Sequence, residues 1–142
     1  MKLTITALLL IFNLTLFAQS KQIAGNYTRS LSEEGKHTIE YKLTLNEDGT
    51  FEFHSYTKLQ GGTPPEVNKY GKGKWSVKNN VVTFSSDKKE DLNSKYTLDF
   101  SNSTARFITK NPRDKTDQIV KTRLTFLDSK MFWLKGIDIF KI

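Results

Sequence analysis

The chain has 142 residues, of which 37% are hydrophobic and 12% aromatic, and it carries 22 Lys and Arg against 15 Asp and Glu. This length and composition suit one globular domain. The sequence contains no cysteine, which excludes a disulfide framework, a thiolate metal site, a catalytic thiol and a lipid-modified cysteine within it. Its two histidines are too few for a metal site of three imidazoles.

Residues 1–18 predict an export signal. Lys2 supplies the positive charge, residues 3–17 form an apolar stretch interrupted by threonines, and Ala18 is a small residue suited to cleavage. The stretch is short for a membrane span, although an uncleaved anchor or a buried strand is the alternative. We expect cleavage after Ala18 or, as a second choice, after Ser20.

The mature chain, residues 19–142, is then a single domain. Its formal charge is +6, because removal of Lys2 takes one positive charge from the +7 of the full sequence. No other long apolar run follows, so we expect a protein that is exported, to the periplasm or outside the cell, without stable membrane insertion.

From residue 22 onward, apolar and polar residues alternate, which is typical of strands with one buried face. We predict a first strand over 22–29, a last one over 137–142 and four hairpins with tight turns between them. The predicted hairpins are 39–45 with 50–54, 71–77 with 81–84, 96–100 with 105–108, and 120–126 with 131–134.

The connections between these hairpins are longer and polar, and they hold all three prolines. They span residues 31–36, 58–69, 87–95 and 110–118. If the strands are adjacent in sequence order, all tight turns lie at one end and all long loops at the other. The pattern therefore predicts an all-β fold, an antiparallel up-and-down β-barrel of about 8–10 strands with a looped mouth. A two-sheet β-sandwich is the alternative.

The aromatic residues in phase with the buried faces form the expected core. These are Tyr27, Tyr41, Phe51, Phe53, Trp75, Phe84, Tyr96, Phe100, Phe107, Phe126 and Phe132. Four of them lie near the predicted mouth, Tyr41, Phe53, Tyr96 and Phe107, and we predict that they line an apolar ligand pocket. Trp133 is out of phase with its neighbours, which indicates an exposed contact or a place on the outer wall.

No catalytic signature is present: the sequence has no nucleophile elbow, phosphate loop or zinc-binding His pair. His37 is in phase with the inward Tyr41, whereas His54 is out of phase with the inward Phe53. We therefore predict that the two histidines point to opposite faces and do not share a metal or acid–base site. We expect a protein that is not an enzyme, with no metal and no cofactor.

The net positive charge raises the question of nucleic acid as a partner. Lys72 and Lys74 alternate with buried positions and so point outward, as do most strand lysines. Together with Lys78 and the aromatic Tyr70 they would form a ridge of the kind that binds nucleic acid. Export argues against that, so we expect a solvated exterior and no nucleic-acid partner.

Three motifs carry a family resemblance: Ile23-Ala24-Gly25-Asn26-Tyr27, Leu43-Thr44-Leu45-Asn46-Glu47-Asp48-Gly49-Thr50-Phe51 and Gly73-Lys74-Trp75-Ser76-Val77. With them the chain resembles the lipocalin-like (calycin-type) small β-barrel proteins exported by bacteria. The lack of cysteine separates it from the copper-response envelope lipoproteins of similar barrel, which use a Cys pair and a lipid anchor.

The resemblance implies a specific closure of the barrel. In lipocalins a Gly-x-Trp on the first strand closes one end, and a basic residue from a late strand packs over the ring. Gly25 matches the glycine, Tyr27 stands in place of the tryptophan, and Arg123 or Lys135 would supply the cation.

The resemblance further implies binding of a small apolar ligand or of a protein partner. We predict a non-enzymatic protein that holds a small apolar ligand in the barrel mouth, gated by the loops over 61–67 and 111–117. The alternative is an envelope protein–protein interaction module, such as an inhibitor or immunity-type factor, with a fully packed barrel. A cavity with aromatic walls would favour the first function, and a filled core with an exposed apolar patch the second. The oligomeric state stays open.

Overall fold

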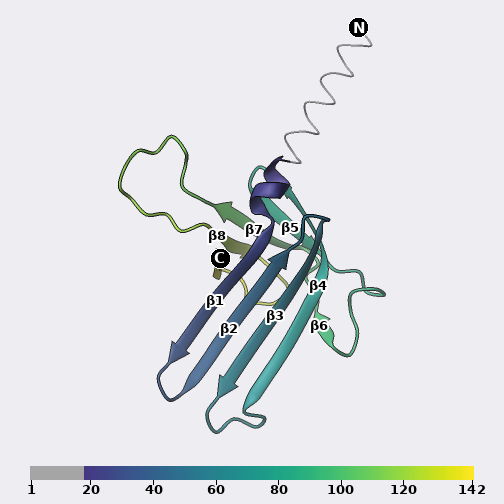
Figure 1. The fold of residues 1–142 in the computed structure, drawn as a ribbon. Helices are drawn as coiled ribbons and strands as arrows, with labels where there is room; N and C mark the ends of the chain where they lie inside the picture. Colours follow the sequence, from purple (N-terminus) through teal and green to yellow (C-terminus); the bar gives the residue numbers. More distant parts are fainter. Residues whose placement is uncertain (1–17) are drawn as a thin grey trace.

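The computed structural model describes residues 18–142, so the predicted export signal lies almost wholly outside the described residues. Residues 18–23 are helical, and nine strands follow (Figure 1). The strands are β1 (Gly25–Glu33), β2 (His37–Leu45), β3 (Thr50–Leu59), β4 (Glu66–Lys78), β5 (Val81–Ser85), β6 (Tyr96–Leu98), β7 (Ser103–Ile108), β8 (Arg123–Asp128) and β9 (Asp138–Lys141). In the described part of the chain, no helix has the length and apolar character needed to cross a membrane.

Eight of the strands close into an antiparallel barrel, which confirms the predicted fold class. Around the barrel the order is β1-β2-β3-β4-β5-β7-β8-β9, and β9 returns to pair with β1. Every neighbouring pair in this circuit is antiparallel, so the chain runs up and down almost in sequence order.

The β2–β3 and β4–β5 hairpins show why this sequence forms strands. In β2 and β3, Leu43 and Phe53 are buried while Lys42 and Glu52 are exposed, as a period of two requires. Gly49 of the connecting turn has φ +87°, a backbone conformation that glycine adopts without a steric penalty. The turn between β4 and β5 instead places two asparagines at positive φ, which asparagine tolerates.

The predicted third hairpin is wrong. Strand β6 pairs in parallel with β4 and forms no hairpin with β7; β7 pairs with β5 and β8. Because β6 is an extra strand within the β5–β7 connection, every later connection lies at the opposite end of the barrel from the prediction.

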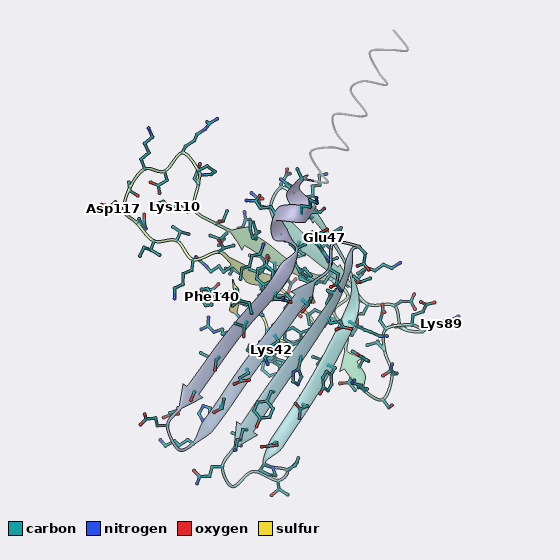
Figure 2. All side chains as sticks on the ribbon, in the orientation of Figure 1. Lys42, Glu47, Lys89, Lys110, Asp117 and Phe140 are labelled. Atoms are coloured by element: carbon teal, nitrogen blue, oxygen red, sulfur yellow. The ribbon has the colours of Figure 1, made fainter. Side chains whose placement is uncertain are left out.

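The long loop between β7 and β8 shows this reversal. Phe107 donates its backbone N–H to Asn80 O in the tight β4–β5 turn, at 2.8 Å. Figure 2 accordingly places Lys110 and Asp117 away from the tips of the β1–β2 and β3–β4 hairpins. The loops over 61–67 and 111–117 therefore lie at opposite ends, and they cannot gate one mouth together.

The predicted fourth hairpin is also wrong. Residues 130–136 form bends and turns, and the strand that pairs with β8 is β9. Phe132, predicted to be core, is 86% exposed. Tyr96, also predicted to be core, lies on the outer wall, where its ring contacts Tyr70. Trp133, predicted to be an exposed contact or part of the outer wall, is instead partly buried against the core. The first strand begins at Gly25, after the helical turn, and extends to Glu33.

Aromatic side chains fill the barrel interior. Phe51 lies at the centre of this packing, with its ring centroid 5.0 Å from that of Phe84 and 5.1 Å from that of Phe100. Phe84 stacks in turn on Phe126, at 5.5 Å. Rings at these separations gain packing energy beyond their buried area, so the closed part of the barrel is a core.

The closure between the first and last strands differs from the one implied by lipocalins. Neither Arg123 nor Lys135 packs over Tyr27; Lys141 of β9 does, with its ammonium 6.0 Å from the ring centroid. Lys141 also donates to Gln22 O at 2.6 Å. A Cβ on Gly25 would lie 2.9 Å from Lys141 Cε, so the glycine makes room for this cation.

Strands β1 to β4 are longer than the barrel they help to close, and Figure 1 shows them as one extended sheet. β1 pairs with β9 only at Tyr27 and Thr28, and β4 pairs with β6 only at Tyr70 and Gly71. We call the projecting part, residues 29–41 and 55–69, the overhang. Its inner face continues the barrel interior without an opposing layer among the described strands.

Candidate functional site

A groove of about 310 Å³ opens where the barrel core ends and the overhang begins. It is lined by Ile39 and Tyr41 of β2, Ser55 and Thr57 of β3, Val67 and Lys69 of β4, and Trp133. This volume is at the lower end of the range usual for small-molecule pockets. The groove is open to solvent along the overhang.

Strand register builds the floor of the groove in two rows. Tyr41, Ser55 and Lys69 lie opposite one another on three adjacent strands and form the row nearest the core. The next row, two residues further along each strand, consists of Ile39, Thr57 and Val67, and Leu31 of β1 completes it. Since side chains two residues apart share a face, the polar row adjoins a mostly apolar one.

Trp133 forms the wall of the groove at its core end. Its ring stacks on Tyr41 with a centroid separation of 5.6 Å and an interplanar angle of 17°. It also contacts Phe53 at 6.3 Å, and Tyr41 and Phe53 lie 5.9 Å apart. The three rings join the filled core to the open groove.

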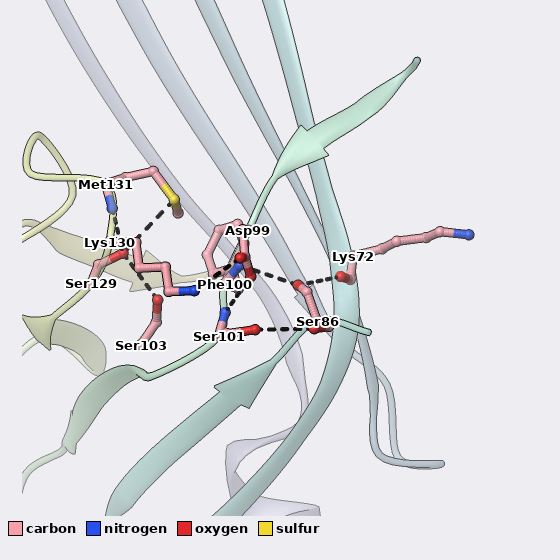
Figure 3. Close-up of polar contacts among 9 residues, drawn as sticks. All are labelled: Lys72, Ser86, Asp99, Phe100, Ser101, Ser103, Ser129, Lys130 and Met131. Atoms are coloured by element: carbon pink, nitrogen blue, oxygen red, sulfur yellow. Dashed lines mark hydrogen bonds and ion pairs between the residues drawn. The ribbon is translucent and has the colours of Figure 1, made fainter. Parts of the chain in front are cut away.

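A polar network holds the turn that carries Trp133 (Figure 3). Lys130 Nζ donates to Asp99 Oδ2 at 3.0 Å, and the hydroxyls of Ser129 and Ser103 are hydrogen-bonded at 3.0 Å. The backbone N–H of Met131 donates to Ser129 Oγ at 3.2 Å. The first two contacts fix residues 129 and 130 to the chain that follows β6, and the third stabilises the turn itself, so together they position the wall of the groove.

The same network lowers the pKa of the Asp99 carboxyl group. Partial burial by itself would raise the pKa of its carboxyl group, but hydrogen bonds from Ser101 and the contact with Lys130 outweigh that effect and lower the pKa below its ordinary value. Asp99 is therefore ionised at neutral pH and pairs with Lys130.

The chain segment after β6 is anchored on its other side by Ser86. Its hydroxyl donates to Lys72 O at 2.8 Å and accepts from the N–H of Phe100 at 3.2 Å. Ser101 Oγ donates to Ser86 O at 3.0 Å. Three hydrogen bonds around one serine thus tie β4, β5 and the β6–β7 segment together.

Two of the residues that line the groove, Tyr41 and Lys69, have ionisable side chains. Burial raises the pKa of the Tyr41 hydroxyl, although the charge of Arg29 acts in the opposite direction, so Tyr41 is neutral at neutral pH. Lys69 is the charged residue among those that line the groove. Within the described residues its ammonium makes no hydrogen bond or ion pair.

The structure brings together two of the four residues predicted to line the pocket. Tyr41 lines the groove, and Phe53 lies directly beneath it, 2% exposed. Tyr96 lies on the outer wall, where the ammonium of Lys72 is 4.8 Å from its ring centroid. Phe107 is buried near the opposite end of the barrel.

The remaining groove residues were missed for different reasons. Ile39 is in phase with Tyr41, and Val67 and Lys69 with the buried positions of β4, so period two contains the signal for all three. Residues 58–69 were predicted to form a loop, however, which removed two of them from consideration. Trp133 lies in a turn, where alternation indicates nothing about direction.

The two histidines lie on opposite faces of the sheet, as predicted. His37 shares the inner face with Tyr41, four residues along β2, while His54 stacks on the outward Tyr70 at 4.6 Å. Among residues 18–142, no group of three or more His, Asp or Glu side chains is placed to hold a metal ion.

A second hollow, of about 480 Å³, lies between the tips of the two overhang hairpins. Its walls are turn and strand-end residues that include Glu33, Lys36, His37 and Lys58. Glu33 is paired with Lys36 at 3.4 Å and approaches His37 at 3.8 Å. This charged, shallow rim lacks an aromatic floor, so we place the candidate site in the groove.

By fold, the chain is a closed eight-stranded antiparallel β-barrel protein with one extended face. Residues 36–135 match the NlpE N-terminal domain family, and because this is more than half of the chain, the protein belongs to that family. The matched region runs from the β1–β2 turn through Trp133 and includes every residue that lines the groove. No curated protein and no solved structure matches the chain.

The family is a domain of bacterial envelope lipoproteins, so membership is consistent with the predicted export. It corrects the separation from envelope lipoproteins that the missing cysteines suggested, because a chain without cysteine belongs to the family. The closer resemblance to lipocalins stays a prediction.

Proposed function

We propose that the protein is a non-enzymatic binding protein of the bacterial envelope that holds a small apolar ligand in the groove. The observation that supports this most directly is the position of the groove. The aromatic core of the barrel continues through Phe53 to Tyr41 and Trp133, whose rings line an open space instead of being covered by further strands.

The physical basis is burial of apolar surface. Ile39, Val67 and the ring of Trp133 are partly buried, so a ligand that covers them removes apolar area from water. Each square ångström buried contributes about 25 cal/mol before the cost of association. The proposed ligand does not enter the closed barrel, because aromatic side chains occupy that space.

We infer a periplasmic or extracellular location and no nucleic-acid partner. The outward lysines Lys72 and Lys95 lie over the ring of Tyr96, at 4.8 and 5.3 Å from its centroid. Pairs of this kind stabilise a solvated wall, so we assign most of the positive charge of the strands to the exterior, with Lys69 as the charged residue of the groove.

A protein partner is the second candidate, favoured by one specific observation. Phe132 is 86% exposed and is adjacent in sequence to the groove residue Trp133. Leu59, at the tip of the overhang, is 46% exposed. Exposed apolar residues at both ends of the groove would suit an interface of the interaction-module type.

The first experiment is native mass spectrometry of the mature protein, purified gently from its own envelope and measured before and after organic extraction. A small-molecule adduct that extraction removes would support the groove function. A bare mass, or co-purification with one defined protein, would instead favour the interaction module.

The second experiment places a charge in the groove. We expect the uncharged fluorophore N-phenyl-1-naphthylamine to bind the wild type and Val67→Glu to weaken that binding by about tenfold or more, because a buried carboxylate is costly. Ser76→Glu puts the same charge on the exposed face of the same strand and should leave binding unchanged. Equal binding by both variants would contradict the proposed site.

A further inference from the structure

We propose that the groove selects an amphipathic anion, a single apolar chain with a carboxylate head, and that the ammonium of Lys69 binds the head. This inference rests on the proposed function, because it names the class of ligand for the same groove. The observation that supports it is the position of the Lys69 ammonium, which has no partner among the described residues and lies beside the row of Ile39, Thr57 and Val67.

Lys69 is unusual among the strand lysines in pointing inward. It lies opposite Ser55, which is 6% exposed and belongs to the face that carries Tyr41. Some lysines of the fold pair with carboxylates, as Lys58 does with Glu66 at 4.0 Å and Lys130 with Asp99 at 3.0 Å. Outward strand lysines such as Lys42 have no such partner among the described residues either, so Lys69 differs from them in facing the groove. For Lys69, the described residues supply neither a carboxylate nor a carbonyl group, so its charge is available to a ligand.

Hydroxyl groups accompany this charge along the polar row. Ser55 lies beside Lys69 and Tyr41 lies beside Ser55, and all three residues line the groove. The Tyr41 hydroxyl is protonated at neutral pH, as for any tyrosine of ordinary or raised pKa, so it is a donor. An ammonium with neighbouring hydroxyl donors is the environment that a carboxylate prefers, since charge-assisted hydrogen bonds are the stronger ones.

The adjoining row suits the apolar chain of such a ligand. Val67, Thr57, Ile39 and Leu31 are opposite one another on β4, β3, β2 and β1. Four strands at the usual spacing of about 4.8 Å give a track of about 14 Å. A chain of about ten to twelve carbons that starts at Lys69 would cross this row.

The other charges near the groove favour one orientation of the ligand. Arg29 ends the polar row on the β1 side, where its Nη1 donates to Asp138 O at 3.1 Å and its Nε is buried without a partner among the described residues, but Arg29 is not among the residues that line the groove. At the tip of the overhang, Glu33 would repel a carboxylate, although Lys36 partly neutralises it. The head is therefore placed at Lys69 and the apolar chain runs from β4 toward β1.

A purely structural role for Lys69 makes a different prediction. Residues 66–69 of β4 form a sheet edge without a second partner strand among the described residues, and an inward charge on such an edge discourages pairing with other chains. That role requires a charge but no selectivity for an anionic ligand. Ligand selectivity therefore separates the two explanations.

The test compares dodecanoate with its uncharged methyl ester, each below its micellar concentration, by isothermal titration calorimetry. We expect the wild type to bind dodecanoate about tenfold more tightly than the ester, the effect of one charge-assisted hydrogen bond. Lys69→Met should abolish this preference while it retains binding of the ester, and Lys69→Arg should keep the preference. Lys42→Met, on the outer face of β2, is the matched control and should behave as the wild type does.

Each result has a defined meaning. If the ratio of the affinities for dodecanoate and its ester is the same in the wild type and in Lys69→Met, the proposed role of Lys69 is overturned. Binding of an apolar ligand in the groove is then still supported. If the wild type binds N-phenyl-1-naphthylamine but neither dodecanoate nor the ester, the anionic chain is the wrong ligand class. If none of the three compounds binds, the proposed function itself fails. Circular dichroism and thermal unfolding of each variant confirm that it is folded.

Discussion

Phe126 and Phe132 show how the environment of a residue, and not its type, decides its contribution. Phe126 lies in β8, is 1% exposed and stacks on Phe84 at 5.5 Å. Phe132 lies in a turn and is 86% exposed. The alternation in the sequence predicted that both were core residues. It fails for Phe132 because a period of two holds only while the chain stays extended.

Alanine substitutions at these two positions should therefore differ sharply. We expect Phe126→Ala to lower the free energy of unfolding by about 3–5 kcal/mol, because it leaves a cavity in a packed core. Phe132→Ala should change it by about 0.5 kcal/mol or less. Urea unfolding of both variants measures the difference. A large loss for Phe132→Ala would mean that the 129–136 turn packs more tightly than its exposure indicates.

The lowered pKa of Asp99 predicts a pH dependence. A carboxyl group with a depressed pKa in the folded state stabilises the fold fully above its unfolded pKa of about 4, and that stabilisation is lost as the pH falls through the lower folded value. We expect Asp99→Asn to lower stability at neutral pH by about 0.5 kcal/mol, since Lys130 is half exposed. The difference from the wild type should shrink below about pH 4. Denaturant unfolding at pH 7 and pH 3 tests this, and a difference that grows on acidification would contradict the assigned ion pair.

At the scale of elements, strand β4 combines two roles. Its first part pairs with β3 up to Lys74, and from Lys74 onward its other edge pairs with β5. Gly73 lies at this transition, where a Cβ atom would come within 2.0 Å of Ser85 O and 3.0 Å of the Phe51 ring. Only a residue without a side chain lets the two strands approach this closely.

Gly73→Ala should accordingly destabilise the barrel by about 1–3 kcal/mol or more, because the clash is with backbone and the strand must shift. Ser76→Ala, on the exposed face of the same strand, is the control and should be nearly neutral. Thermal unfolding monitored by circular dichroism measures both. Equal melting temperatures would show that β4 can move away from β5 at little cost.

The pairing of β6 accounts for the main error in the predicted strand topology. Residues 96–100 alternate as a strand does, and a turn and a second alternating segment follow them. This local pattern predicted a hairpin of 96–100 with 105–108. Pairing of β6 with β4 instead depends on contacts between residues far apart in sequence, such as Tyr70 with Tyr96. Local alternation carries no information about which edge a strand will join.

For the molecule as a whole, the overhang predicts uneven stability. The barrel half of β2 and β3 packs against the aromatic core, whereas the overhang has one open face and open edges at β1 and β4. Local unfolding requires less free energy where fewer apolar contacts are broken.

We therefore expect backbone amides at Ile39 and Thr57 to exchange with deuterium at least about tenfold faster than those at Leu43 and Phe53, which lie on the same strands. Addition of a ligand that fills the groove should slow exchange in the overhang and leave the barrel half unchanged. Hydrogen exchange followed by NMR or mass spectrometry gives both results. Uniform protection along β2 and β3 would show that the overhang is as rigid as the barrel.

The sequence by itself determined the all-β class, the antiparallel barrel, two of the hairpins and the inward face of most strands. It could do so because alternation and turn chemistry are local properties, set by neighbouring residues such as those of the Asn46–Gly49 turn. For the candidate site it predicted Tyr41 and the adjacent Phe53.

Only the tertiary structure decided the rest: the position of β6, the end of the barrel at which each later loop lies, and the contact of Trp133 with Tyr41 that walls the groove. It also showed that Lys141 packs over Tyr27 and that Lys69 faces the groove. These features depend on which strand edges meet when the barrel closes. That choice is made by packing between distant segments, which no local pattern of residues encodes.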